Sequence, residues 1–288
     1  MMQTALLEVK NLSFSRSDRV IFRDAAFSLA PKESLGLCGP IGCGKTTLLR
    51  ILTGLERPQA MNLSLEGVPV TAQKDFQRLR RKVGYVLQNP DDQLFFPEVI
   101  EDVMFGPLNL GLSYAQARTR ALDVLSMLGI ANLAESISFR LSGGQKRLVS
   151  IACILAMEPE VILLDEPTSG LDPEERNRFK NVIDNISDGR IVILSTHIVE
   201  DVEASCDKTI VMADGNFIYQ GDTLELCRYA AGRIVEVDEE QVKQGIDGEI
   251  EKTYLKKGRK MHRVILREAV SNALEPTVED GYICLLKK

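Results

Sequence analysis

Residues 39–46 are Gly39-Pro40-Ile41-Gly42-Cys43-Gly44-Lys45-Thr46, and this stretch decides the fold. It matches the phosphate-binding pattern G-x-x-x-x-G-K-[ST], and it lies between an apolar segment and a helical pattern, as that pattern requires. The glycines let the main chain curl so that successive N–H groups face an anion. Lys45 then reaches the β- and γ-phosphates, and the Thr46 hydroxyl can bind Mg²⁺. The sequence therefore predicts a nucleotide site.

Short β-branched apolar runs alternate with longer helical patterns on both sides of this loop, up to about residue 224. Such alternation is typical of βαβ units around a mainly parallel, buried sheet. The predicted strands are Ser34–Cys38, Lys82–Leu87, Val161–Leu164, Ile191–Ser195 and Thr209–Met212. The predicted helices are Thr46–Leu52, Tyr114–Leu128, Gly144–Ala156 and Pro173–Ile186, the second and fourth with N-caps Ser113 and Asp172. We therefore expect an α/β fold.

The two ends of the chain depart from this pattern. At the start, Ala5–Phe14 and Val20–Leu29 predict an antiparallel β flank. The last 64 residues predict a small α/β unit, with a strand at Arg233–Asp238, a hairpin at Lys252–Arg267 turning at Lys257-Gly258, a helix near Glu268–Leu274 and a strand at Tyr282–Leu286. The expected domains are therefore 1–224 and 225–288.

Composition narrows the class of protein. The chain carries 35 Lys and Arg against 41 Asp and Glu, a net charge of −6, whereas dedicated nucleic-acid binders usually have a basic excess. No apolar run approaches the roughly 18 residues that a membrane-spanning helix needs, and the first residues lack a signal-peptide pattern. Six scattered cysteines fit reduced thiols better than a disulfide or zinc framework. These features predict an acidic, soluble, intracellular protein.

A pair of carboxylates follows the most apolar predicted strand. Asp165 and Glu166 come directly after Val161–Leu164, at the edge where α/β sheets bind ligands. Asp165 is expected to hold Mg²⁺, directly or through water. Glu166, one residue further, is expected to polarise the attacking water as a general base.

One further motif indicates which family of phosphate-loop proteins the chain resembles, and it is Leu141-Ser142-Gly143-Gly144-Gln145. With it, the chain resembles the nucleotide-binding subunits of ABC transporters over about residues 5–224. The matching motifs occur in the family's order: the Walker A loop at 39–46, a Q-loop glutamine at Gln88, the LSGGQ signature at 141–145, Walker B at 161–166, a D-loop at 169–172 and a switch histidine at His197.

This resemblance implies a set of site residues. The catalytic residues it implies are Glu166, His197 and Gln88. Magnesium would be held by Thr46, Gln88 and Asp165. ATP would be bound by Gly39, Pro40, Ile41, Gly42, Cys43, Gly44, Lys45, Thr46, Thr47, Ser142, Gly143, Gly144, Gln145, Asp172 and Arg16.

In the family, the signature motif contacts ATP that is held by the opposite subunit. Physically, the small residues and the helix N-terminus at 142–145 form a second anion site. Because this chain has one Walker A loop and one signature, the resemblance implies a dimer with a second ATPase subunit, either homo- or heteromeric.

One position departs from the family pattern. Where family members usually carry an aromatic residue that stacks on adenine, this chain has Arg16. Its guanidinium plane can stack on a base, and Phe14, two residues earlier on the same strand face, is the alternative.

The segment that starts at Gln88 resembles one group within this family more than the family in general. Gln88–Pro97 and the following residues up to Leu112 resemble the ATPase subunits of energy-coupling-factor (ECF) transporters, including CbiO-type subunits of cobalt and nickel uptake. The resemblance implies a helical subdomain at about 89–157, a peripheral position on the cytoplasmic face of the membrane, and import of cobalt, nickel or a vitamin. A transmembrane coupling protein and a substrate-binding membrane component would dock near Gln88–Phe105, where three phenylalanines form an apolar edge.

Three other functions compete with this one. The chain could serve another ABC transporter, or it could be a soluble ABC ATPase that acts on nucleic acid or the ribosome. The latter usually carries a long coiled-coil insertion or two cassettes, and this sequence has neither, so no nucleic acid is expected. A small-molecule kinase would lack the signature. The segment 225–288 is open to a role in dimerisation, regulation or lipid contact.

Overall fold

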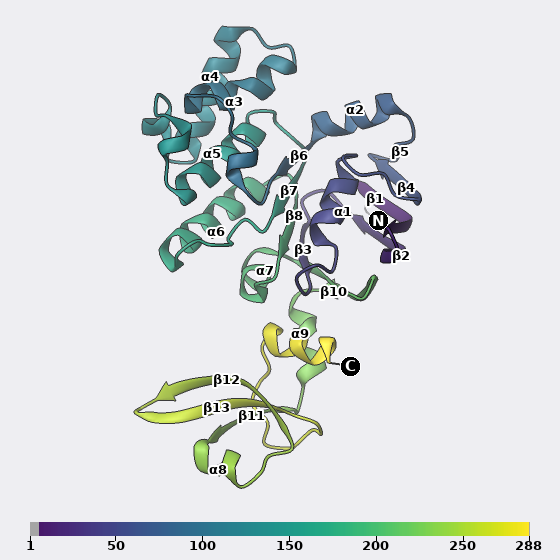
Figure 1. Cartoon of the computed structure of the whole chain (residues 1–288), viewed down its shortest axis with the longest axis vertical. Coiled ribbons are helices and arrows are strands. Elements are labelled where there is room, and N and C mark those ends of the chain that lie inside the picture. The colour runs from purple at the N-terminus through teal and green to yellow at the C-terminus, as the bar shows by residue number, and fades with distance from the viewer. Residues whose placement is uncertain (1–5, 288) are drawn as a thin grey trace. The chain divides into compact units, whose positions relative to one another are not determined.

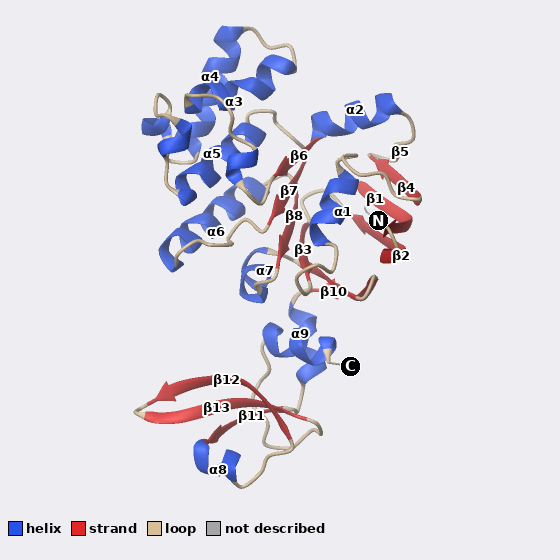
Figure 2. Cartoon of the chain, viewed as in Figure 1, coloured by secondary structure: helices blue, strands red, loops and turns tan. Residues whose placement is uncertain are grey.

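A computed structural model describes residues 6–287, so Ala5, the start of the predicted β flank, lies outside the described residues. The chain divides between Tyr219 and Gln220 into two compact units. Figure 1 traces both units along the chain, and Figure 2 separates their helices from their strands.

The first unit is built on a six-stranded sheet in the order β10-β9-β3-β8-β7-β6. The strands are β3 (Ser34–Cys38), β6 (Val83–Val86), β7 (Val161–Asp165), β8 (Ile191–Thr196), β9 (Lys208–Ala213) and β10 (Asn216–Asp222). The pairs β3·β8, β3·β9, β7·β8 and β6·β7 are all parallel. The loops that follow β3, β7 and β8 therefore lie at one edge of the sheet.

A four-stranded sheet in the order β2-β1-β4-β5 covers one side of this parallel sheet, together with helix α1 (Figure 1). Its strands are β1 (Leu7–Arg16), β2 (Arg19–Leu29), β4 (Ala60–Leu65) and β5 (Val68–Pro69), all paired antiparallel. Alternate residues of the parallel strands join one core with α1 (Lys45–Leu52) and this sheet; Leu37, Leu163 and Ile193 are fully buried there. Helix α2 (Gln73–Lys82) leads from β5 to β6.

Helices occupy the other side of the parallel sheet (Figure 1). Between β6 and β7 the chain forms a helical region of η1 (Pro90–Asp92), α3 (Val99–Asn109), α4 (Tyr114–Met127), η2 (Ala131–Leu133), η3 (Ser138–Arg140) and α5 (Gly143–Leu155). Beyond it follow α6 (Pro173–Ser187) and α7 (Val199–Ser205). Ser113 and Asp172 cap α4 and α6 as predicted, each accepting a main-chain N–H of the first turn.

The predicted α/β fold is confirmed. Every strand and helix predicted in the first unit is present, and the observed bounds differ from the predicted ones by one or two residues for those in the parallel sheet and its helices. Several elements have no counterpart among the predictions: α2, α3, α7, β4, β5 and β10. In α3, Gly106 and Pro107 weaken the helical signal.

The second unit is a three-stranded antiparallel sheet in the order β11-β13-β12. It contains η4 (Leu224–Ala230), β11 (Ile234–Asp238), α8 (Glu239–Lys243), β12 (Gly248–Lys256), β13 (Arg259–Leu266) and α9 (Val278–Leu286). The predicted hairpin is confirmed, since Lys257 and Gly258 both have positive φ, as a two-residue turn of this kind requires.

Two predictions for this unit are wrong. The segment predicted as a strand, Tyr282–Leu286, is the second half of α9, whose N-cap Thr277 and Asp280 form a capping box. A short apolar run does not distinguish a strand from a buried helix, and the cap is the signal that decides. The predicted helix near Glu268–Leu274 is a loop, whose N–H groups at Val270 and Leu274 donate to carbonyls of the β11 segment instead.

The charged side chains of the second unit are mostly paired with one another. Lys256 contacts Glu236, Lys260 contacts Glu239, and Lys287 contacts Glu249, all at the surface. Beneath them, Arg263 forms two hydrogen bonds with the fully buried Asp280, at 2.9 and 2.6 Å. Next to this pair, burial and the neighbouring Asp280 raise the pKa of Glu251 from 4.5 to about 8.

We expect the stability of the second unit to fall with rising pH because of Glu251. The raised pKa means that the folded unit favours the protonated carboxyl, so the stabilisation is complete below pH 4.5 and is lost as the pH rises through about 8. Hydrogen exchange of β12 and β13 amides, corrected for the intrinsic exchange rate, should show protection that falls between pH 5 and 9. Glu251→Gln should flatten this dependence, whereas Glu249→Gln at the surface should retain it; parallel profiles for wild type and Glu251→Gln would contradict the assignment.

Candidate active site

The phosphate-binding loop borders a cavity of about 650 Å³ in the first unit. The loop needs glycine where the main chain turns: Gly39 and Gly44 have φ of 158° and 114°. A Cβ at Gly39 would lie 2.4 Å from the carbonyl oxygen of Met212, and one at Gly44 would lie 2.6 Å from Ile21. The cavity is lined by Arg16, Ser17, Arg19, Ile21, Ile41, Gly42, Gly44, Lys45, Thr46, Thr47, Gln88, Glu166, Ser169 and His197.

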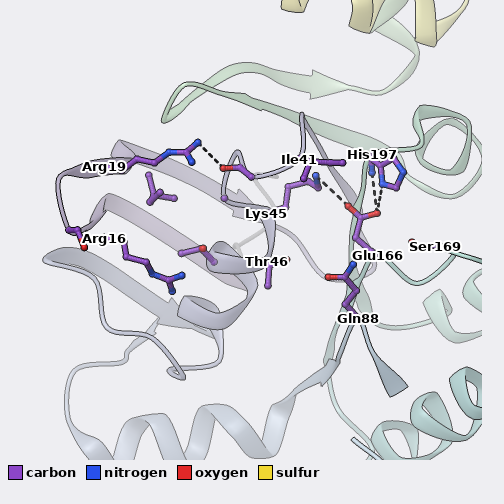
Figure 3. A pocket seen from close by; sticks show the side chains of 14 residues that line it. Arg16, Arg19, Ile41, Lys45, Thr46, Gln88, Glu166, Ser169 and His197 are labelled. Carbon is purple, nitrogen blue, oxygen red and sulfur yellow. Dashed lines mark hydrogen bonds and ion pairs between the residues drawn. The ribbon is translucent and has the colours of Figure 1, made fainter. Parts of the chain in front are cut away.

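Lys45, at the first position of α1, is the buried cation of this cavity. Its side chain is only 6% exposed, and its Nζ donates to the carbonyl oxygen of Gly39 at 2.9 Å. The same Nζ lies 3.4 Å from Oε1 of Glu166, so a lysine from the loop after β3 meets a carboxylate from the end of β7 (Figure 3). The structure thus brings the predicted phosphate ligand and the predicted base together.

Asp165 gathers three hydroxyl groups around its buried carboxylate. Thr46 Oγ1 and Ser195 Oγ donate to Oδ1 at 3.1 and 3.0 Å, and Tyr85 OH donates to Oδ2 at 3.0 Å. Burial raises the pKa of Asp165 despite these hydrogen bonds. A buried carboxylate beside a threonine hydroxyl is the oxygen donor set that Mg²⁺ prefers, so these residues fit the predicted ion.

Glu166 is held in an unusual main-chain conformation. Its φ is 45°, in the left-handed region that non-glycine residues rarely adopt, and its N–H donates to the carbonyl oxygen of Ser195 at 2.9 Å. The side chain lies between Lys45 and His197, with Oε2 2.7 Å from His197 Nδ1 (Figure 3). His197 also donates its main-chain N–H to Oε2 at 3.3 Å. The predicted switch histidine therefore touches the predicted base directly.

The signature motif lies outside this cavity. Ser142 caps α5, its hydroxyl accepting from Gln145 N–H at 3.2 Å while Gln145 Oε1 accepts from Ser142 N–H at 2.9 Å. None of residues 142–145 lines the phosphate-loop cavity; they border two other hollows near α6. Asp172 does not line that cavity either, and its carboxylate caps α6. Within one chain, the structure keeps the signature and the phosphate loop apart.

Arg16 lines the cavity, as the sequence predicts, but its guanidinium is already engaged. Its NH2 lies 2.6 Å from Oε1 of Glu56, a carboxylate whose side chain is 12% exposed and which also contacts Arg50 at 3.1 Å. Nearby, Arg19 donates to the carbonyl oxygen of Gly42 in the phosphate loop at 3.0 Å. The alternative Phe14 is buried in the core and does not line the cavity.

The sequence analysis did not identify Tyr85, Ser195 or Arg19 as residues of this site. Tyr85 and Ser195 lie in buried strands, where a single polar residue gives no signal beyond its place near a strand end. Arg19 begins β2, and only the loop that it contacts indicates a role.

The chain is similar to known proteins. A family model described as ABC transporter matches residues 22–169. The chain belongs to this family. It is 36% identical to the energy-coupling factor transporter ATP-binding protein EcfA of Methanosphaera stadtmanae, over 99% of both chains. It is 44% identical to the cobalt import ATP-binding protein CbiO of Rhodobacter capsulatus, over 69% of this chain and 71% of that one.

A solved structure agrees with these relatives. The structure of cbiO1 from Clostridium perfringens, part of the ABC transporter complex cbiONQ, matches with a TM-score of 0.71 and 33% identity. The match covers 76% of this chain and 89% of that one. The chain is therefore an ATP-binding ABC ATPase, as predicted from its motifs. Across residues 6–287, no helix has both the length and the apolar character needed to cross a bilayer.

We expect His197→Ala to lower kcat for ATP hydrolysis while leaving KM nearly unchanged. His197 contacts Oε2 of Glu166, the predicted base, and losing the orientation of a general base costs on the order of 100-fold in rate. Steady-state phosphate release from the full chain measures both constants. The only other histidine, His262, lies in the second unit, and His262→Gln provides the control, with an expected rate close to wild type. Equal rates for His197→Ala and wild type would contradict the contact's role.

Proposed function

We propose that two copies of this ATPase domain enclose two ATP molecules and use their hydrolysis to drive import through membrane partners. One observation carries the proposal. The phosphate loop and the signature motif of a single chain border different hollows, although both present N–H groups suited to phosphate. A second copy, placed head to tail, would bring its signature helix to the Lys45 cavity and complete both sites.

The residues at the cavity have distinct roles in this proposal. Lys45 and the loop N–H groups bind the β- and γ-phosphates, and Ser142, Gly143 and Gly144 of the second copy contact the γ-phosphate from the other side. Bound Mg²⁺, held by Thr46, Gln88 and Asp165, would neutralise charge on the phosphate oxygens.

Glu166 is the general base. It accepts the proton of the attacking water, while His197 orients its carboxylate at 2.7 Å and senses the γ-phosphate. Gln88 borders the same cavity and begins the segment Gln88–Phe105, where the membrane partners are proposed to dock. Loss of the γ-phosphate is therefore transmitted from the cavity to that segment.

Glu166→Gln should trap ATP and stabilise the dimer, because the isosteric amide keeps the contacts but accepts no proton. ATP hydrolysis should fall by about 100-fold or more. Light scattering should give the mass of a dimer with ATP and of a monomer with ADP. The matched control is Glu160→Gln, directly before the opposite end of β7, where the carboxylate pairs with Lys82 away from the cavity. Wild-type turnover in Glu166→Gln would contradict the base, and an ATP-bound monomer would contradict the dimer.

The proposed docking surface for the membrane coupling protein is the aromatic cluster of Phe95, Phe96 and Phe105. Their ring centroids lie 4.7 to 5.7 Å apart, yet Phe95 and Phe105 are 63% and 43% exposed. Exposed aromatic rings supported by one another suit an amphipathic helix of a partner. Asp91 nearby already pairs with Lys146 at 2.6 Å, so within this acidic pair Asp92 is the better candidate for a basic partner residue.

We expect Phe95→Ser with Phe105→Ser to abolish binding of the proposed membrane coupling protein. Loss of two exposed apolar anchors typically weakens binding by 2–4 kcal/mol. Tyr114→Ser, which removes a 68% exposed aromatic ring from α4, is the matched control and should retain capture. Circular dichroism verifies that each variant is folded. Undiminished capture by the double variant would place the docking surface elsewhere.

The imported solute and the adenine contact complete the proposal. The relatives named for energy-coupling-factor transport and cobalt import favour cobalt, nickel or a vitamin as the imported solute. We assign adenine stacking to Arg16, whose guanidinium is oriented by Glu56 beside the cavity. Such a subunit is peripheral, on the cytoplasmic face of the membrane, and residues 225–288 form a separate domain with a dimerising or regulatory role.

A further inference from the structure

Arg147 connects three motifs of the active site from inside the protein. It lies in the second turn of α5, two residues after the signature, and is 8% exposed. Its NH1 donates to the carbonyl oxygen of Glu166 at 2.6 Å, and its NH2 donates to the carbonyl oxygen of Gln88 at 3.1 Å. One guanidinium therefore holds the main chain at both the proposed base and the Q-loop glutamine.

The positive charge of Arg147 is buried, and its hydrogen bonds go to main-chain carbonyls and not to a carboxylate. Two main-chain carbonyls accept hydrogen bonds from the guanidinium, and charge-assisted hydrogen bonds of this kind are stronger than neutral ones. A planar fork reaches two acceptors at fixed separation, which the ammonium of a lysine does not reproduce. Simple packing does not require a buried arginine here, since an apolar side chain would fill the space without burying a charge.

One of the two carbonyls belongs to a strained residue. Glu166 has a φ of 45°, a conformation that persists only where the surroundings impose it. Its N–H is held by Ser195 on one side, and its C=O is held by Arg147 on the other. The pair of contacts sets the direction in which the Glu166 side chain leaves the main chain, toward Lys45 and His197.

We propose that Arg147 is a positioning residue that couples the signature helix to the catalytic base of the same chain. The inference rests on the proposed dimer, in which the N-terminus of α5 contacts the ATP held by the second copy. A shift of α5 when that ATP binds carries Arg147 with it and moves the carbonyls of Glu166 and Gln88. Each chain's base is therefore aligned by the nucleotide at the other site.

The test compares kcat and KM for ATP in Arg147→Lys and Arg147→Gln. Lysine reaches one carbonyl and glutamine reaches one at most, so misplacement of Glu166 should lower kcat by about 10- to 100-fold while KM changes less than about threefold. Arg190 is the matched control, because it also donates to two main-chain carbonyls, of Pro159 and Ile186, away from the cavity. Arg190→Gln should keep the wild-type kcat.

A double-mutant cycle separates positioning from general damage. If Arg147 acts through Glu166, then Arg147→Lys should slow the wild type but have no further effect on the residual rate of Glu166→Gln. Additive losses in the two backgrounds, a kcat of Arg147→Lys equal to wild type, or a matching loss in Arg190→Gln would each overturn the inference.

The dimer itself is tested separately in the same series. ATP-dependent dimerisation of Glu166→Gln reports on the proposed function, whatever the Arg147 variants do. If that dimer forms and Arg147→Lys keeps full activity with an unchanged dependence of rate on ATP concentration, the coupling role fails while the proposed function stands. If Glu166→Gln stays monomeric with ATP, the proposed function fails and the coupling inference falls with it.

Discussion

The buried carboxylate of Asp165 is the interaction on which the rest of the site depends. Its oxygens accept hydrogen bonds from Thr46, Ser195 and Tyr85, which come from α1 and from the two strands beside β7. A carboxylate at 1% exposure needs such hydrogen-bond partners, so these contacts connect the ends of β6, β7 and β8 to the start of α1. The apolar core below supplies the rigidity, and Asp165 aligns the ends of the strands.

Much of this arrangement could be predicted from the sequence. The phosphate loop, the carboxylate pair and His197 are marked by residue type and by position after apolar strands, and parallel strands place such ends along one edge. The contacts among them could not be predicted in the same way. Tyr85 and Ser195 belong to strands whose pattern indicates only core, and Arg147 lies just beyond the signature motif. Their contacts appear only where distant segments of the chain meet.

In the second unit, less of the structure could be predicted from the sequence. Its hairpin follows from a Lys-Gly turn between two strand patterns, whereas Tyr282–Leu286 has strand-like residues in a helix. There the capping contact of Thr277 with Asp280 and the burial of Cys284 and Leu285 outweigh local β preference. In short segments of small units, such tertiary contacts determine whether a helix or a strand forms, because the sequence pattern alone does not distinguish the two.

Asp102 connects the aromatic cluster to the loop before the signature motif. Its buried carboxylate accepts the main-chain N–H groups of Phe95 and Phe96 at 2.9 and 3.0 Å, and the hydroxyl of Ser138, four residues before Ser142, at 2.9 Å. The link between the aromatic cluster and the signature loop thus runs through peptide groups and not through the phenylalanine rings. A substitution of the rings would therefore change what this surface binds without removing the hydrogen bonds that connect it to the signature loop.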